Sequence, residues 1–181
     1  MWFGCIIAMF FYNLVLFISV RDYNYLRYSF YLFSFVLFGA YYEGFGHEFL
    51  TPNSPAMNTQ TALVIRGCLV TFAVNLFSFY MLETKPKSWA TRSFQFLIIS
   101  ALVVIFLTSI FGSNPIFLMC WYLSAVLTAV GIMVVAVARY REGFRPAAYF
   151  IFAFFALSFS MLVIFLPLLG ITEVKSWGIH L

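Results

Sequence analysis

The chain has 181 residues, of which 64% are hydrophobic and only 9% are charged. A soluble domain carries roughly a quarter charged residues, and one of this size could not bury so much apolar surface. The composition therefore excludes a soluble globular domain and predicts an all-α membrane protein surrounded by lipid. The net charge of +4 comes without a basic block, so we expect no nucleic-acid partner.

Six apolar runs are long enough to cross a bilayer as helices, because a helix rises about 1.5 Å per residue and the hydrocarbon core is about 30 Å thick. The first two runs, 2–20 and 25–42, are separated by a four-residue polar turn. The other predicted helices cover 62–82, 94–111, 116–138 and 147–166. We expect one transmembrane bundle domain, with an outer tail, 171–181, before a seventh helix that is missing from the chain.

Three polar residues lie inside the first and third runs. Asn13 is near the middle of its run, where an amide needs a partner, so we expect it to face the bundle and bond across helices. Asn75 lies deep in the third run, and Arg66 lies about one turn from its start. Arg66 either extends to the outer headgroups or pairs with Glu43 or Glu48, and the sequence leaves both alternatives open.

The longest polar connection, 43–61, contains the only cluster of metal-capable side chains, which is Glu43, His47 and Glu48. On a helical turn Glu43 and His47 would share a face. The HExxH spacing is absent, however, and the prolines and glycines of this connection are expected to break any helix. We therefore favour a solvated outer loop over a zinc site, and we predict no metal and no cofactor.

Other local patterns concern helix ends, cysteines and catalysis. Pro86 is expected to stop the third helix, and Asn114 followed by Pro115 predicts an N-cap with proline at the first helical position. No HExxH, GxSxG or P-loop pattern is present, so we predict that the chain is not an enzyme. The cysteines lie singly in apolar runs and are expected to be small buried hydrophobic residues: Cys5, Cys68 and Cys120.

The basic residues are distributed unevenly between the turns. Of the ten Lys and Arg residues, only Arg66 and Lys175 lie on the side of the second and fourth turns. Cytoplasmic turns carry an excess of Lys and Arg, so we expect the first, third and fifth turns inside the cell and the N-terminus outside. The eight residues in or beside those turns are Arg21, Arg27, Lys85, Lys87, Arg92, Arg139, Arg141 and Arg145.

Four short stretches resemble one known family. FYNLVLFISVRDYNYLRY (11–28) resembles its first helix and the turn into the second helix, and YYEGFGHEFL (41–50) resembles the end of the second helix. FYMLETKPKSW (79–89) and REGFRPAAYF (141–150) resemble the end of the third helix and the start of the sixth helix. The family is the membrane domain of the bacterial seven-transmembrane receptors with diverse intracellular signalling modules (7TMR-DISM).

The resemblance implies a sensor in the bacterial inner membrane. It would relay a signal from an unknown ligand or an outer sensory domain to a cytoplasmic domain of the same parent chain. That output would be a histidine kinase of a two-component system or a diguanylate cyclase, and neither is in this chain. A small transporter or channel is the alternative, although unbroken helices without mid-depth ionisable residues favour the receptor. A homodimer is an open alternative to a monomer.

Overall fold

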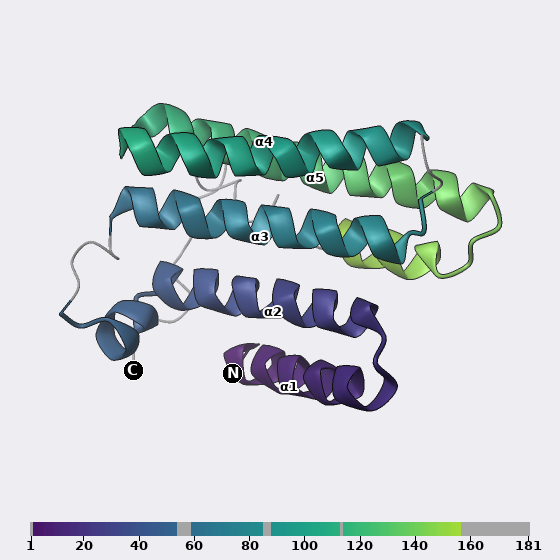
Figure 1. Ribbon diagram of the computed structural model, residues 1–181, viewed down its shortest axis with the longest axis horizontal. Coiled ribbons are helices and arrows are strands. Elements are labelled where there is room, and N and C mark those ends of the chain that lie inside the picture. The colour runs from purple at the N-terminus through teal and green to yellow at the C-terminus, as the bar shows by residue number, and fades with distance from the viewer. Residues whose placement is uncertain (1, 54–58, 85–87, 113, 157–181) are drawn as a thin grey trace, which may run out of the picture. The chain divides into compact units, whose positions relative to one another are not determined.

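The chain is helical in the part that the structure describes (Figure 1). The structure is a computed structural model, and it describes residues 2–53, 59–84, 88–112 and 114–156. Within these ranges no strand forms, which confirms the predicted all-α fold. The chain divides into two compact units, Met1–Ile132 and Met133–Leu181.

Five long helices and one short π-helix make up the labelled elements. The first, α1, spans Trp2–Val20, which are the predicted bounds. The other elements are α2 (Tyr23–Tyr42), η1 (Gly46–Leu50), α3 (Gln60–Met81), α4 (Trp89–Phe111) and α5 (Pro115–Arg141). A further apolar helix covers Ala147–Ala156, and the rest of the predicted sixth helix and the tail 171–181 lie outside the described residues.

The helix starts are fixed by short polar side chains. The side chains of Asp22, Ser88 and Asn114 each accept a hydrogen bond from a backbone N–H of the following turn, at 2.9, 3.2 and 3.0 Å. Such caps satisfy amide groups that the first turn of a helix leaves without partners. The Asn114–Pro115 prediction is confirmed, whereas the predicted start of α4 at residue 94 is wrong because Ser88 begins that helix at Trp89.

One other expectation about the helix boundaries is wrong, and another lies outside the described residues. The connection after α2 was expected to contain no helix, yet η1 forms there, two residues after Gly44, whose φ of +89° is a conformation that glycine adopts readily. Pro86, which was expected to stop the third helix, lies outside the described residues. That helix ends at Met81, where Leu82 caps it and Glu83 takes a positive φ of 46°.

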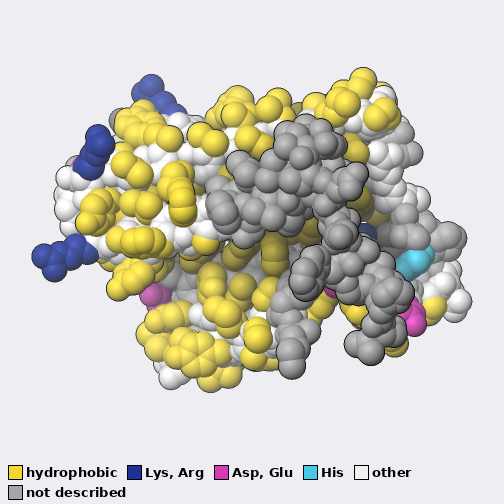
Figure 2. All heavy atoms as spheres, turned by 180° about the vertical axis from the view of Figure 1, so that it is seen from behind, with side chains coloured by type: hydrophobic (Ala, Val, Ile, Leu, Met, Phe, Trp, Pro, Cys, Tyr) yellow, Lys and Arg dark blue, Asp and Glu magenta, His cyan; other side chains and the backbone are white. Residues whose placement is uncertain are grey.

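Consecutive helices of the first unit are neighbours. In Met1–Ile132, α2 packs between α1 and α3, and α3 packs between α2 and α4 (Figure 1). Hydrophobic side chains cover much of the described surface on the face in view, and the Lys and Arg side chains in view are few (Figure 2). Among the described residues, α1, α3, α4 and α5 contain stretches that are long and apolar enough to cross a membrane. These helices make the protein multi-pass, while the predicted count of six crossings stays a prediction.

Candidate functional site

Among the described residues of the first unit, the third helix makes polar contacts with both α2 and α5. It is the helix of this unit that packs against both α2 and α4, and its side chains also reach α5. Contacts occur near both ends of α3 and at its centre. We therefore built the candidate site along α3, beginning at the end nearest η1.

At that end, Arg66 of α3 meets an aromatic ring of α2. Its guanidinium carbon lies 3.6 Å from the centroid of the Tyr41 ring, in a cation–π arrangement. The hydroxyl of Tyr41 lies 3.2 Å from that of Thr51, and the backbone of Gly46 lies so close that an added Cβ would be 2.7 Å from the ring. Tyr41 thus joins α2, α3 and the η1 connection at a single ring.

At the next residue of α3, Gly67, the helix approaches α5 closely. A Cβ built on Gly67 would lie 2.2 Å from the indole ring of Trp121, a distance that no side chain can occupy. Trp121 also packs against Val64 and Cys68, and Phe38 of α2 lies edge-on to it at 5.5 Å. Only glycine at position 67 allows this indole to lie directly against the α3 backbone.

Asn75 links α3 to α5 at the centre of the helix. Its amide nitrogen donates to the hydroxyl of Thr128 at 2.9 Å and to the carbonyl of Thr71 at 2.8 Å. Asn75 is fully buried, and its Oδ1 atom has no hydrogen-bond partner among the described residues. The same holds for the hydroxyls of two other buried serines, Ser78 of α3 and Ser124 of α5.

The far end of α3 repeats the arginine–tyrosine contact with the roles exchanged. Arg27 of α2 lies 3.5 Å from the centroid of the Tyr80 ring of α3, and it also donates to the side chain of Asn24 at 2.9 Å. Tyr80 lies fourteen residues after Arg66, and Arg27 lies fourteen residues before Tyr41. The two contacts are therefore in register on antiparallel helices, about 21 Å apart along the axis.

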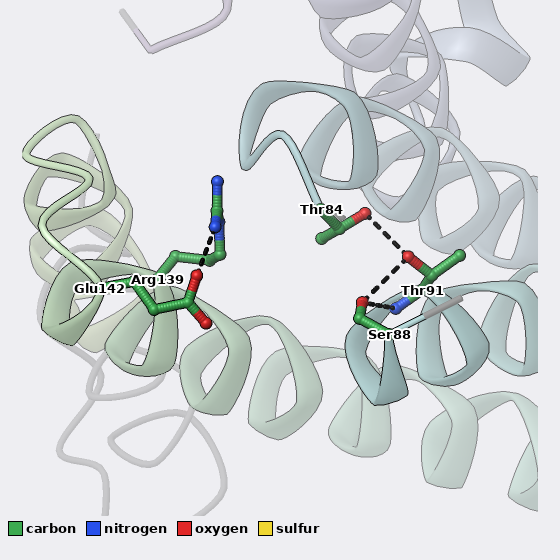
Figure 3. A network of polar contacts seen from close by, with 5 residues as sticks. All are labelled: Thr84, Ser88, Thr91, Arg139 and Glu142. Atoms are coloured by element: carbon green, nitrogen blue, oxygen red, sulfur yellow. Dashed lines mark hydrogen bonds and ion pairs between the residues drawn. The ribbon is translucent and has the colours of Figure 1, made fainter. Parts of the chain in front are cut away.

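The turns beyond these helix ends are held by local hydrogen bonds (Figure 3). Between α3 and α4, the hydroxyl of Thr91 lies 3.2 Å from that of Ser88 and donates to that of Thr84 at 3.3 Å. In the second unit, Arg139 forms a 2.6 Å ion pair with Glu142. Both turns belong to the basic set that the sequence predicts to lie inside the cell.

The structure places the six predicted polar residues at several separate points. Asn75 makes the helix-to-helix bond that was expected of Asn13, while the amide of Asn13, although buried, donates to the Met9 carbonyl within α1. His47 is half-buried in η1, and its Nδ1 atom has no partner among the described residues. Glu43 and Glu48 are exposed, and pairing of either with Arg66 stays a prediction.

Sequence reasoning missed the partners of these residues rather than the residues themselves. Tyr41, Tyr80 and Thr128 were not singled out, because tyrosines near helix ends also fit an interfacial aromatic belt. The Arg66–Gly67 dipeptide was the available signal, since a small residue beside a charge inside an apolar run indicates a close helix contact. In the described part of the chain, no three His, Cys, Asp or Glu side chains come together as metal ligands.

The helices and the buried polar contacts define a multi-pass helical membrane protein. The whole chain, residues 1–181, matches the family described as 7TM diverse intracellular signalling. The chain therefore belongs to this family of transmembrane signalling domains, which confirms the resemblance drawn from its motifs. No curated protein and no solved structure matched the chain.

Proposed function

We propose that this chain is the membrane core of a bacterial sensor that passes an extracytoplasmic signal to a cytoplasmic output domain. Its membership of a transmembrane signalling family supports the class of function. Arginine–tyrosine contacts hold α2 to α3 near both ends of the two helices, and this arrangement supports a relay along them. In this proposal the chain is not an enzyme, and catalysis belongs to the output domain.

The proposed relay is a small displacement of α3 against α2 and α5. Tyr41 joins α3 to the η1 connection, so a signal that moves this connection also moves the Arg66–Tyr41 contact. Close packing at Gly67 and the Asn75–Thr128 hydrogen bond then couple the displacement to α5. Packed interfaces switch between discrete arrangements rather than deform continuously, so a small shift can reach the far turns.

The remaining parts of the proposal concern orientation and partners. The basic turns lie on the cytoplasmic side of a bacterial inner membrane, and the N-terminus lies on the outer side. The output is a histidine kinase or diguanylate cyclase of the same parent chain, and the input is an outer ligand or sensory domain. Reading the genomic frame downstream of residue 181 tests the output, because a stop codon directly after it contradicts the proposal.

Reporter fusions test the orientation. An alkaline phosphatase reporter, which is active only outside the cytoplasm, should be inactive when inserted in the turn 142–146 and active in the connection 43–53. A fluorescent protein that folds only in the cytoplasm should give the opposite pattern. Phosphatase activity at 142–146 would overturn the proposed threading and the direction of signalling with it.

Hydrogen exchange tests the relay itself. Tyr41→Leu should raise amide exchange not only in 44–51 but also in the distant turn 82–84 and at Ser88, measured by mass spectrometry in nanodiscs. Ile99→Ala is the matched control, because Ile99 is 58% exposed on α4 and should leave that turn unchanged. Exchange that rises only beside residue 41 would show that α3 does not transmit the change.

A further inference from the structure

A groove lies along one face of α5 in the second unit, away from the α3 site in sequence. It has a volume of about 490 Å³, and its described lining comes from α5 alone: Met133, Val134, Val137, Ala138 and Arg141. Every lining residue except Arg141 is apolar, and the groove is open on one side. An open apolar groove on a membrane helix faces hydrocarbon chains, not water.

Arg141, at the end of the groove, differs from the nearby Arg139 in having no side-chain partner among the described residues. Arg139 is neutralised by its ion pair with Glu142 and also lies 5.3 Å from the Phe144 ring centroid. Arg141 is exposed and has no side-chain partner among the described residues, and the same is true of Arg145. An anion at the groove end would therefore meet the uncompensated guanidinium group of Arg141.

The length of the groove matches one leaflet of a bilayer. Met133, Val137 and Arg141 lie at intervals of four residues, so they follow one line along the helix over about 12 Å. Half of the hydrocarbon core is about 15 Å thick. With Arg141 at the membrane surface, where α5 ends, the apolar part of the groove covers most of the depth of one leaflet.

We propose that this groove binds an anionic phospholipid, with its acyl chain along Met133, Val134 and Val137 and its phosphate on Arg141. A planar guanidinium binds phosphate oxygens through two parallel hydrogen bonds. Basic sites at the membrane surface attract anionic headgroups. This site requires neither the signalling role proposed above nor a particular sidedness of the chain.

Native mass spectrometry of the full 181-residue chain tests the proposal. The chain is released from mixed micelles that contain equal amounts of phosphatidylglycerol and phosphatidylcholine. The wild type should retain phosphatidylglycerol preferentially, and Arg141→Gln should lower this preference about fivefold. Arg92→Gln is the matched control, since Arg92 is an exposed arginine of another basic turn and its loss should leave the preference unchanged.

A second variant separates the groove from the charge. Val137→Trp fills the apolar part and should reduce retention of both lipids while leaving Arg141 in place. Free glycerol phosphate should not compete, because it lacks the acyl chain. Should Arg141→Gln fail to fold, high salt applied to the wild type provides the same measurement, since screening should abolish the preference.

Several outcomes would overturn the proposal. Equal retention of both lipids by the wild type shows that no anionic site exists. An equal loss in Arg92→Gln assigns the effect to overall surface charge, and competition by glycerol phosphate assigns it to a phosphate site without an acyl-chain groove. Lipid retention that stays unchanged in Val137→Trp would show that lipid does not occupy the groove. A dimer that dissociates in the gas phase into chains without bound lipid would show the same.

Discussion

Helices α1 and α3 contain the same three kinds of residue at nearly the same spacing and use them in opposite ways. Gly4, Cys5 and Asn13 of α1 correspond to Gly67, Cys68 and Asn75 of α3. A Cβ on Gly4 would meet nothing within 4 Å, whereas one on Gly67 would collide with Trp121. Cys5 is exposed and Cys68 is fully buried.

The two asparagines complete the comparison. Asn13 bonds within its own helix, and Asn75 bonds to a threonine on another helix. Only 6% of the apolar stretch of α1 is buried, against 39% of that of α3. Small and polar residues in an apolar helix therefore permit close packing without requiring it. The neighbouring helix decides whether each residue becomes a structural contact.

Replacing the two glycines should give the largest difference. Gly67→Ala should lower the free energy of unfolding by about 2 kcal/mol, because Trp121 must move away from α3. Gly4→Ala should be neutral or stabilise the protein by up to about 1 kcal/mol, since alanine favours the helix. Thermal unfolding in detergent measures both, and equal midpoints for the two variants would contradict the comparison.

The asparagines should differ by a smaller amount. Asn75→Leu should cost about 1 kcal/mol by removing the hydrogen bond to Thr128, and Asn13→Leu should cost less because its bond stays within α1. A double-mutant cycle with Thr128→Val isolates the helix-to-helix term. A coupling energy of zero for the Asn75–Thr128 pair would show that this bond does not hold α3 to α5.

Replacing Arg66 tests a cation–π contact to Tyr41 that α3 makes and that has no counterpart in α1. Arg66→Leu should cost about 0.5–1 kcal/mol and expose the connection 43–61 to proteases, because the ring of Tyr41 loses its cation. Arg27→Leu is the control, since it removes the equivalent contact at the other end of α2 and α3. Unchanged cleavage within 43–61 in the Arg66 variant would argue against the contact.

Chemical labelling of the native cysteines tests the difference between α1 and α3 without any mutation. In detergent, a maleimide should label Cys5 and Cys120 before Cys68, because only Cys68 is buried. Partial unfolding should remove the difference. Labelling of Cys68 as fast as Cys5 in the folded protein would show that α3 is not enclosed as described. Burial was expected of all three cysteines from the sequence, and it is wrong for Cys5 and Cys120.

Local signals predicted much of the fold and little of the site. The bounds of α1 followed from the length of its apolar run, and the Asn114 cap followed from the adjacent Pro115. Both signals involve residues that are close in the sequence. The start of α4 was missed because the side-chain cap of Ser88 was not recognised, and η1 was missed because glycine and proline were expected to break any helix there. Arg66 and Asn75 were identified as unusual, but their partners Tyr41 and Thr128 were not.

The sequence by itself determined that this protein is a helical membrane protein, because lipid requires long apolar runs whose backbone groups bond within each helix. It also determined the basic turns and the helix caps, which depend on adjacent residues. The tertiary structure alone decided that Asn75 bonds across helices to Thr128, 53 residues away, while Asn13 does not. Which of two similar residues faces a neighbouring helix depends on how whole helices pack. The residues that flank an asparagine in the sequence do not reveal that packing.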